Sequence, residues 1–327
     1  MKAVLYRTSG GSEVLTVTEA PTPEAAPGEV LVRLQVAGVN PTDWKRRTTA
    51  APDGFQIPGQ DGAGVIEAVG EGVDRSRVGQ RVWVWLAARP PLDEPRRKAP
   101  GRRYGTAAQY TVVPSAQAVP LPDAVSFDAG AGFGVPAVTA WHCLAGGPVD
   151  GANVLVAGGA GAVGNMAIAL ARRLGANVVS TVSGPEKAAL ATAAGAHTVV
   201  NYRDADAAAQ IRAAAPDGID HIVEVALGAN LELDLAVLAP RGSISTYADD
   251  PLPDLPVRRL MVGNVVLRFV LLYGLTDAAL AAAADGVAAV APVLPVLSGD
   301  RFDLGATARA HDAVQSGALG KVLLDIP

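Results

Sequence analysis

Short apolar runs alternate with glycine- and proline-rich breaks through the first third of the chain. The runs are rich in β-branched and aromatic side chains and occupy residues 2–6, 29–39, 63–70, 80–87 and 107–114. Runs of this kind between turn signals are typical of β-strands. The pattern therefore predicts a small all-β unit with many turns.

Near residue 123 the pattern changes to apolar runs that alternate with amphipathic helical stretches. Residues 123–144 have helical apolar spacing. Strand-like runs, with helical stretches between them, follow at 153–158, 177–182, 197–202, 221–226 and 242–247. This alternation is typical of a parallel sheet with crossover helices, so the predicted fold class is α/β. The last segment, 301–327, predicts a helix and a strand that rejoins the first domain.

Length and composition set the domain count and exclude some classes of protein. A chain of 327 residues is too long for one ordinary core, so we predict one domain at 1–122, completed by about 292–327, and another at 123–291. The apolar tract 278–297 is interrupted by Asp285 and two prolines, which predicts a soluble alanine-rich helix and no membrane span. The N-terminus lacks the apolar core of a signal peptide, and a cytoplasmic location is expected.

Charge and cysteine content narrow the candidate chemistry further. The formal net charge of −5 argues against nucleic acid as the main partner. Cys143 is the single cysteine, so no internal disulfide forms, and its apolar surroundings favour a small buried side chain over a nucleophile. The Pro-rich, mainly basic segment 88–105 is interpreted as a surface loop. The alternative is a lid over a substrate cleft, with Tyr104 as its residue of interest.

The sequence GAGAVG at residues 159–164 matches the dinucleotide-binding pattern G-x-G-x-x-G. An apolar strand leads into it and a helical stretch leads out. Gly159 permits the tight turn, Gly161 leaves room for the pyrophosphate, and Gly164 lets the helix pack on the strand. The helix N-terminus then offers N–H groups and a positive dipole end to the phosphates.

The end of the next strand predicts which dinucleotide binds. An NAD site places Asp or Glu there, whereas this chain has Thr181, Val182 and Ser183. Lys187 follows within one helical turn, and Glu186 is expected to point away. A hydroxyl and an ammonium suit a 2′-phosphate, so NADPH is predicted over NADH. Lys187 taken alone fits a solvated helix lysine equally well.

Several longer segments carry a family resemblance. They are AGVNPTDWKRR, PGQDGAGVIEAVGEGV, VPAVTAWHCL, GGAGAVG, GAHTVVNYR and GALGKVLLDIP. Over nearly its whole length the chain resembles the medium-chain dehydrogenase/reductase superfamily, and within it the zinc-independent quinone oxidoreductases related to ζ-crystallin. The resemblance implies a GroES-like β domain plus a Rossmann doubly wound parallel sheet, with the active site in the cleft between them. It also implies a homodimer formed through the Rossmann sheets, with 264–274 as the edge strand.

The same resemblance implies individual site residues. The catalytic candidates are Asn40, Thr139 and Tyr104. The cofactor-binding candidates are Gly159, Ala160, Gly161, Ala162, Val163, Gly164, Ser183, Lys187, Tyr202, Asn230, Tyr247, Ala248, Phe269, Val270, Leu271 and Lys321. Phe269 to Leu271 would approach the nicotinamide by main chain. For Lys321 the alternative is a stem packed in the cleft wall.

Metal ligands are missing from the places where zinc relatives carry them. Zinc alcohol dehydrogenases of this superfamily have a Cys near the place of Asn40 and a His-Glu pair at Gln60 and Asp61. Zinc needs about three Cys, His or carboxylate ligands that converge, and the four histidines of this chain are scattered. We therefore expect no metal. Gly62 and Gly64 are expected to let the β-domain strand turn tightly.

The function expected from these residues is reduction of an activated double bond. Hydride from NADPH adds to a quinone or to the β-carbon of an α,β-unsaturated carbonyl, and the resulting oxygen anion needs hydrogen-bond donors and a proton. Asn40 and Thr139 are the candidate donors, and Tyr104 or water is the proton source. Asn40 also fits a turn residue, with Thr42 and Asp43 as a helix N-cap.

Two alternative functions remain open from the sequence. One is a biosynthetic enoyl reductase on the same scaffold. The other is a non-catalytic protein that keeps the dinucleotide pocket, since some ζ-crystallin relatives are lens components and RNA binders.

Overall fold

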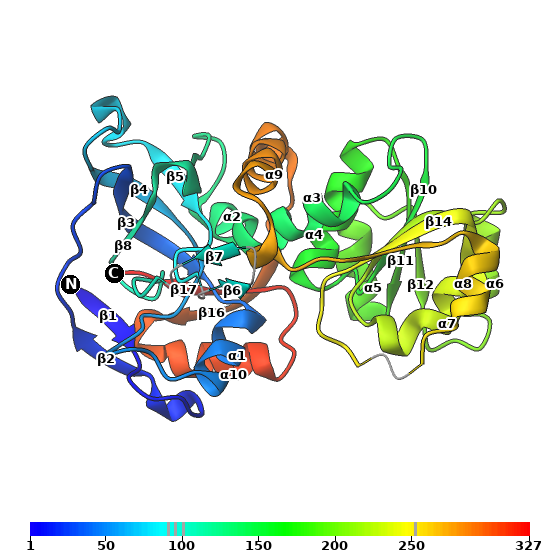
Figure 1. Ribbon diagram of the computed structural model, residues 1–327, viewed down its shortest axis with the longest axis horizontal. Helices are drawn as coiled ribbons and strands as arrows, with labels where there is room; N and C mark the ends of the chain where they lie inside the picture. The colour runs from blue at the N-terminus through cyan, green and yellow to red at the C-terminus, as the bar shows by residue number, and fades with distance from the viewer. Residues whose placement is uncertain (90–91, 95–96, 100–101, 252–253) are drawn as a thin grey trace. The chain divides into compact units, whose positions relative to one another are not determined.

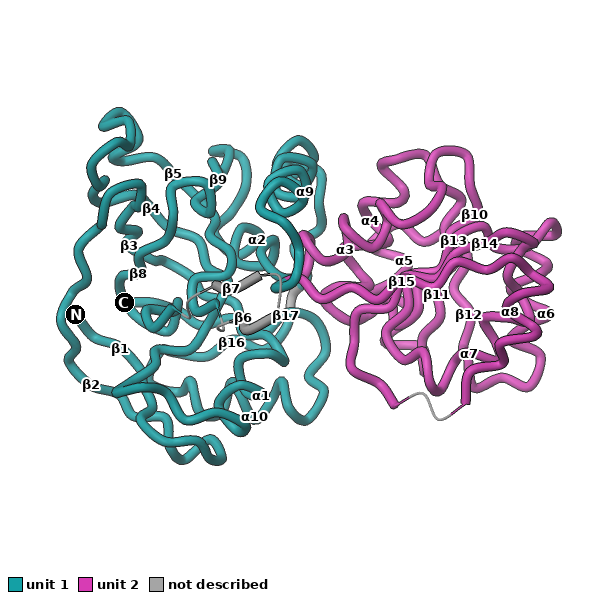
Figure 2. Tube along the Cα trace, viewed as in Figure 1, with its two compact units in different colours: residues 1–135, 273–327 teal, residues 136–272 magenta. Residues whose placement is uncertain are grey.

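The computed structural model describes residues 1–89, 92–94, 97–99, 102–251 and 254–327 (Figure 1). The chain forms two compact units (Figure 2). Unit 1 contains Met1–Val135 and Tyr273–Pro327, and unit 2 contains Pro136–Leu272. These contact-based boundaries fall at Val135 and Tyr273, whereas the expected domains divide at 122 and 291.

Unit 1 is built mainly on antiparallel strands, with β16 and β17 paired in parallel. Its described strands are β1 (Lys2–Leu5), β2 (Thr16–Glu19), β3 (Glu29–Gly38), β4 (Asp61–Val69), β5 (Arg81–Val84), β6 (Leu92–Glu94), β7 (Arg97–Ala99), β8 (Tyr110–Pro114), β9 (Ala118–Pro120), β16 (Ser298–Asp303) and β17 (Lys321–Asp325). The main sheet runs β16-β17-β3-β4-β5-β9, with β8 also paired to β3. The strands predicted in the first third of the chain are thereby confirmed.

The closing strand rejoins unit 1 as expected. β17 pairs antiparallel with β3, with Leu323 opposite Gly38. Val30, Val32 and Leu324 belong to one buried apolar cluster. The two ends of the chain therefore share a single core, which fixes the start of β17 beside the end of β3.

Unit 1 also contains helices, most of which connect these strands along the chain. They are α1 (Pro41–Thr49), α2 (Phe127–Gly132), α9 (Asp277–Val290) and α10 (Thr307–Gln315), with short turns η1 (Ser12–Val14), η2 (Arg75–Arg77), η3 (Ser115–Gln117), η4 (Phe133–Ala137, which continues into unit 2), η5 (Leu272–Gly274), η6 (Ala291–Val293) and η7 (Leu304–Ala306). α9 is the alanine-rich helix predicted from the tract 278–297. No helix in the described part of the chain is long and apolar enough to cross a membrane.

Asn40 is the N-cap of α1. Pro41 occupies the first helical position, where its missing N–H removes no helical hydrogen bond. The Asp43 carboxylate accepts the Asn40 backbone N–H at 2.8 Å, which satisfies a donor at the helix start. The N-cap is therefore Asn40 and not Thr42, because the helix begins earlier than expected, while Asp43 contributes to the cap from inside the helix.

Gly62 and Gly64 lie inside β4 and do not form a tight turn. A Cβ built on Gly64 would lie 2.1 Å from the Arg33 carbonyl oxygen and 2.8 Å from the Leu34 Cα. The glycine therefore permits close approach of β3 and β4 at a point where their register shifts. The expectation of a turn was wrong because sequence alone does not show which strand passes behind a glycine.

Unit 2 is a parallel sheet with crossover helices. Its strands are β10 (Asn153–Ala157), β11 (Asn177–Val182), β12 (Thr198–Asn201), β13 (Ile219–Glu224), β14 (Leu238–Thr246) and β15 (Val266–Phe269). Its helices are α3 (Val138–Leu144), α4 (Ala162–Arg173), α5 (Pro185–Ala193), α6 (Ala207–Ala214), α7 (Leu227–Val237) and α8 (Val257–Gly263). The described strands follow the order β12-β11-β10-β13-β14-β15, the Rossmann arrangement with its reversal at β10 and β13. The α/β prediction is confirmed.

Cys143 lies on α3 with none of its surface exposed. Burial raises the pKa of its thiol to about 12. The prediction of a small buried side chain is confirmed.

Candidate active site

Three neighbouring strand ends bring Asn40, Asp61 and Lys321 together in unit 1. Asp61 begins β4 opposite Gly38, the last residue of β3. Asn40 follows β3 by two residues, and Lys321 begins β17 on the other side of β3. The order of the sheet thus gathers residues from both ends of the chain.

These side chains form a closed hydrogen-bonded group, called here the Lys321 triad. The Asn40 Nδ2 donates to Asp61 Oδ2 at 2.7 Å, and the Lys321 Nζ donates to Asn40 Oδ1 at 2.6 Å. The same ammonium lies 3.0 Å from Asp61 Oδ2. Asn40 and Lys321 are each 3% exposed and Asp61 is 0% exposed. Such burial is tolerated because the two charges are paired and hydrogen-bonded.

Two features of the backbone hold the triad in place. The Val135 N–H donates to Asp61 Oδ1 at 2.8 Å, just before Pro136 interrupts the helical hydrogen bonds. A Cβ on Gly38 would lie 2.5 Å from the Lys321 Cε. The missing side chain of Gly38 therefore leaves the space through which the lysine stem enters.

A second polar group adjoins the triad. The Gln60 Nε2 donates to Thr42 Oγ1 at 2.9 Å, and the Gln60 amide also bonds the Tyr273 hydroxyl at 2.7 Å. Tyr273 escaped the sequence analysis, because a tyrosine in an apolar run gives no signal of a polar partner 213 residues away.

Asp43 is a buried carboxyl group beside this second cluster. Burial raises the pKa of its carboxyl to about 7, the Asn40 backbone N–H opposes the rise, and the charge of Asp61 adds to it. At neutral pH the side chain is therefore divided between its acid and its carboxylate form.

This donor set does not fit zinc. Among the residues that the structure describes, no group of three or more His, Cys, Asp or Glu side chains could hold a metal ion. Asn40 and Asp61, at places matched to zinc ligands, bind the Lys321 ammonium, and Gln60 is occupied by Thr42 and Tyr273. Zinc prefers thiolate, imidazole and carboxylate ligands. A zinc ion bound to Asn40 and Asp61 would also be repelled by the positive charge of the Lys321 ammonium, which contacts both side chains.

The GAGAVG loop of unit 2 joins β10 to α4. The left-handed backbone angle of the turn falls on Gly158 (φ 68°), one residue before the glycine to which the sequence pattern assigned the turn. A Cβ on Gly159 would instead lie 2.1 Å from the Ser180 Oγ of β11. The role predicted for Gly159 is thus corrected to close strand packing. A Cβ on Gly164 would lie 2.4 Å from the Gly158 carbonyl oxygen, so this glycine permits close packing of α4 as predicted, against the loop that follows β10.

Gly161 leaves open space at the start of α4. Among the described atoms, a Cβ there would meet the Gly158 carbonyl oxygen at 3.4 Å and nothing closer. As the N-cap, Gly161 has no side chain to bond the first N–H groups of the helix. Free N–H groups and an empty cradle fit a pyrophosphate.

Ser183 and Lys187 lie together after β11. The Lys187 Nζ donates to the Ser183 Oγ at 2.9 Å, and Glu186 is exposed. The Tyr202 backbone N–H donates to the Val182 carbonyl at 3.1 Å, and its side chain is 41% exposed. The structure thus brings together the three residues expected around the adenosine phosphate.

Asn230 has a partner within unit 2. Its Nδ2 donates to Glu224 Oε1 at 2.9 Å, and the same oxygen accepts the Val225 and Ala226 N–H groups. Burial, followed by the charge of Glu224, raises the pKa of Asp234 well above its ordinary value. The expectation that Asn230 faces the cofactor stays a prediction, and in this structure its amide supports the loop after β13.

The remaining cofactor candidates follow β14 and β15. Tyr247 and Ala248 come directly after β14, and Phe269 ends β15. The Val270 N–H donates to the Thr246 carbonyl at 2.8 Å, and Leu271 is 59% exposed. Since β13, β14 and β15 are parallel, these residues lie at the carboxyl edge of the sheet, where open α/β folds bind ligands.

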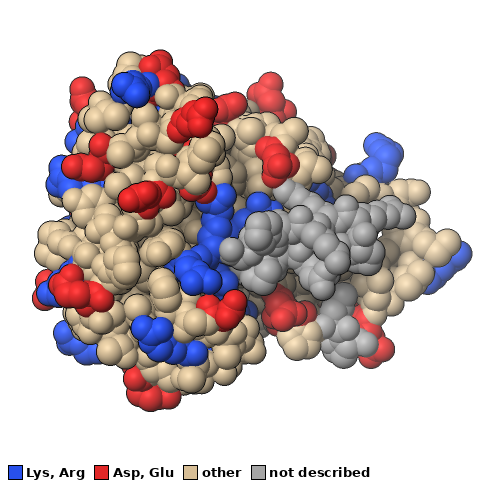
Figure 3. All heavy atoms as spheres, turned by 60° about the vertical axis from the view of Figure 1, so that its left-hand side comes forward, with Lys and Arg blue, Asp and Glu red and all other residues tan. Residues whose placement is uncertain are grey.

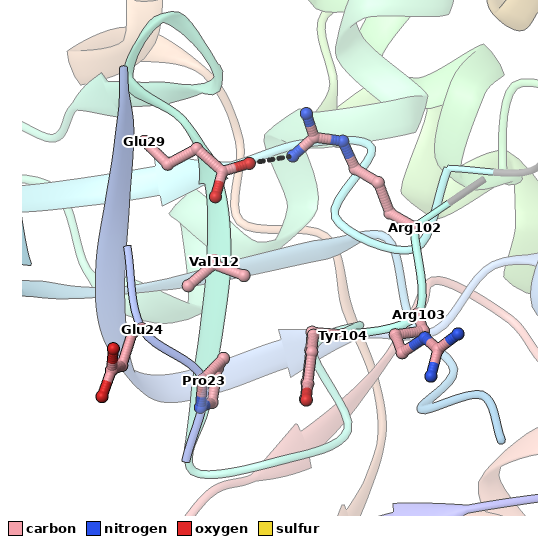
Figure 4. Close-up of a pocket in the computed structure, with 7 residues that line it drawn as sticks. All are labelled: Pro23, Glu24, Glu29, Arg102, Arg103, Tyr104 and Val112. Carbon is pink, nitrogen blue, oxygen red and sulfur yellow. Dashed lines mark hydrogen bonds and ion pairs between the residues drawn. The ribbon is translucent and has the colours of Figure 1, made fainter. Parts of the chain in front are cut away.

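Tyr104 is placed away from the Lys321 triad. Its ring contacts Phe55 edge-on, and it lines a pocket of about 410 Å³ (Figure 4). The Arg102 and Glu29 side chains of that pocket form an ion pair at 3.4 Å. Glu29 begins β3, whereas Asn40 follows its other end. Residues 90–91, 95–96 and 100–101 of the predicted surface loop lie outside the described residues.

Thr139 is 6% exposed on α3 and belongs to unit 2. Its pairing with Asn40 stays a prediction.

Acidic and basic side chains both occur across the molecular face drawn in Figure 3.

Comparisons with known proteins cover the whole chain. Residues 26–123 match the alcohol dehydrogenase GroES-like domain, and residues 162–287 match the zinc-binding dehydrogenase family. A quinone oxidoreductase of Lama guanicoe is 31% identical over 99% of this chain and 97% of its own length. A mycobacterial protein solved in complex with NADPH is 28% identical, with a TM-score of 0.82 over 99% of this chain and 100% of its own. An NAD-dependent alcohol dehydrogenase is 29% identical, with a TM-score of 0.83 over 100% of both chains.

Proposed function

The chain belongs to the medium-chain dehydrogenase/reductase superfamily, in its quinone oxidoreductase branch, and from this premise we propose that it is an NADPH-dependent, zinc-independent reductase. The enzyme is an oxidoreductase for a small molecule. The proposed reaction delivers a hydride to a quinone, or to the β-carbon of an α,β-unsaturated carbonyl.

The Lys321 triad is the observation that carries this proposal. Oxidation of an unactivated alcohol is helped by a Lewis acid that binds its oxygen. Here the corresponding place holds an internal ion pair. Reduction of a conjugated carbonyl needs only hydrogen-bond donors for the oxygen that becomes negative. The residues present therefore favour the reductive reaction.

Bound NADPH supplies the hydride in this proposal. In an enone the hydride forms the new C–H bond at the β-carbon, and the π electrons move to the carbonyl oxygen. The Asn40 amide and the Thr139 hydroxyl are the proposed donors to that oxygen. A proton then adds to the α-carbon of the enone. In a quinone the hydride supplies one of the two hydrogens of the hydroquinone, and a single proton supplies the other. Tyr104 lies in a pocket with Glu29, at the start of β3, whereas Asn40 follows the other end of that strand. Water is therefore the proposed proton source in place of Tyr104.

The contact between Ser183 and Lys187 supports NADPH over NADH. It gathers a hydroxyl and an ammonium after β11, where an NAD site would carry a carboxylate. One charged hydrogen bond contributes about 1.5–3 kcal/mol, which is about 10- to 100-fold in affinity. We therefore expect Lys187→Ala to raise the KM for NADPH about 10- to 100-fold and to leave that for NADH unchanged.

Glu186→Ala is the matched control, since Glu186 is exposed on the same helical turn. It should leave both KM values unchanged. A wild-type NADPH/NADH ratio near one that Lys187→Ala does not alter would contradict the cofactor assignment.

Turnover decides between the candidate functions. NADPH oxidation should be measured with 9,10-phenanthrenequinone, simple enones and enoyl thioesters. Turnover of the first two supports the proposal, and a strong preference for thioesters would favour a biosynthetic enoyl reductase. Tight NADPH binding without turnover of any substrate would contradict an enzymatic role and favour the non-catalytic alternative.

A further inference from the structure

We propose that Lys321 and Asp61 are positioning residues that hold the Asn40 carboxamide in a single orientation, with its remaining N–H directed as a donor to the reacting oxygen. This inference rests on the proposed function. It gives the buried ion pair a task in the reaction: the pair fixes the direction of an amide N–H donor.

The chemistry of the triad permits only one orientation of the amide. Lys321 carries three N–H donors and no acceptor, and an ionised Asp61 carries acceptors and no donor. The Asn40 Oδ1 must therefore face the ammonium, and its Nδ2 must face the carboxylate, as the distances of 2.6 Å and 2.7 Å show. A flipped amide would oppose donor to donor and acceptor to acceptor. The Asn40 side chain is thus held in one of the two orientations that differ by exchange of its amide oxygen and nitrogen.

One hydrogen of the amide is left for another partner. Nδ2 carries two hydrogens, and the bond to Asp61 uses one of them. An ammonium on the amide oxygen withdraws electron density, and hydrogen bonds in a chain polarise one another in a dry environment. The Lys321 contact thus opposes the electron density that the Asp61 carboxylate returns to the amide nitrogen, and the direction of the second N–H is fixed before substrate binds. Fixed donors of this kind stabilise a developing oxygen anion without reorganisation.

The triad is anchored more firmly than the pairing of two charges requires. Asp61 Oδ1 accepts the Val135 N–H, while its Oδ2 holds both other members. Gly38 leaves room for the Lys321 stem, and the Lys321 side chain is 3% exposed. A buried ion pair adds little net stability compared with apolar residues of the same size. Orientation of Asn40 is therefore a better account of the arrangement than stability.

The test removes both charges together. Lys321→Met alone leaves Asp61 as an unpaired buried charge and is expected to destabilise the fold. The double variant Lys321→Met/Asp61→Asn is neutral, so its Tm should lie well above that of Lys321→Met. Its kcat for quinone or enone should nevertheless stay about 10- to 100-fold below wild type, as when a residue that orients a ligand or a donor is lost. The Kd for NADPH, measured by fluorescence titration, should not change.

A second comparison tests whether the pair acts through Asn40. Asn40→Ala should lower kcat by at least as much as the double variant does. In the Asn40→Ala background, adding Lys321→Met/Asp61→Asn should lower kcat no further, because residues that act as a unit are not additive. Independent effects that multiply would overturn the inference.

The matched control is an exposed ion pair in the same sheet. Arg33 of β3 and Glu67 of β4 lie 3.3 Å apart, with side chains 46% and 49% exposed. Arg33→Met/Glu67→Gln should leave kcat at the wild-type value. Recovery of wild-type kcat together with Tm in Lys321→Met/Asp61→Asn would overturn the inference and leave the proposed function intact. Absence of turnover in the wild-type protein would instead overturn the proposed function, and the inference with it.

Discussion

Asp43 is the residue whose charge state changes near neutral pH. Burial raises the pKa of its carboxyl from 3.8 to about 7. Below about pH 4 the native and unfolded states both hold the proton, and above about pH 7 neither does. Between these values the native state holds a proton that the unfolded state has lost. The contribution of Asp43 to stability therefore falls as pH rises through this window, by about 1.4 kcal/mol per pH unit.

Asp43→Asn should remove this dependence, because the amide mimics the neutral acid and keeps an acceptor for the Asn40 N–H. The free energy of unfolding of the variant should gain on that of wild type as pH rises from about 4 to 7 and stay level above. Urea titrations at pH 4.5, 6 and 8 measure the difference. A difference for Asp43→Asn that is constant over the range would refute the prediction.

Single site residues were predictable where the signal is local. Gly161, Ser183 and Lys187 lie within one strand–loop–helix pattern and its successor. The structure leaves space at Gly161 and brings Ser183 and Lys187 into contact, and their cofactor roles stay predictions. Lys321 and Asn40 are 281 residues apart in the chain, and no local pattern reports that their side chains meet. Lys321 was predicted at the cofactor from resemblance, whereas its described partners are Asn40 and Asp61.

At the scale of elements, β15 is the strand with an unusual surface. It ends the described sheet of unit 2, and Val266 and Phe269 on it are 54% and 70% exposed. An edge strand offers unpaired N–H and C=O groups, and exposed apolar side chains beside them favour association. We propose that a second copy of the chain covers β15. The family resemblance also implied a homodimer with residues 264–274 as the edge strand.

Phe269→Glu should convert the proposed dimer to a monomer, because each copy would bring a charge into an apolar contact. Analytical ultracentrifugation at micromolar concentration measures the change. Val78→Glu is the control, since Val78 is 50% exposed in unit 1 and lies away from β15 in the chain. A wild-type protein that sediments as a monomer would contradict the proposal.

The sequence predicted where the strands and helices lie along the chain better than it predicted which of them contact each other. The alternation of strand and helix after residue 123 gave every strand of the unit 2 sheet up to β14, since period and turn residues are local properties. The close approach of β3 and β4 at Gly64 escaped prediction, because a glycine looks the same whether it turns the chain or admits a neighbour.

At the scale of the whole molecule, the two compact units carry different parts of the candidate site. The GAGAVG loop belongs to unit 2, and the Lys321 triad belongs to unit 1. A ligand stabilises the state that binds it by an amount that grows with its concentration over Kd. NADPH should therefore stabilise unit 2 directly, by about 2.7 kcal/mol at a concentration 100 times Kd.

Tryptophans can report this difference. Trp44, Trp83 and Trp85 lie in unit 1, and Trp141 lies in unit 2. In a Trp141→Phe variant, fluorescence reports the unfolding of unit 1, whereas in the triple variant Trp44→Phe/Trp83→Phe/Trp85→Phe it reports unit 2. NADPH should raise the midpoint seen by Trp141 at least as much as the midpoint seen by the other three. A larger rise in the unit 1 signal would contradict the assignment of the cofactor to the loop.

The buried thiol of Cys143 has a consequence for an enzyme with these proposed substrates. Quinones and enones arylate or alkylate cysteines by conjugate addition, and the attacking species is the thiolate. The sole cysteine of this chain is fully buried, and with a pKa of about 12 its thiol is neutral. The folded protein therefore presents no cysteine nucleophile to the electrophiles it is proposed to consume, and it is spared inactivation through thiol adducts with them.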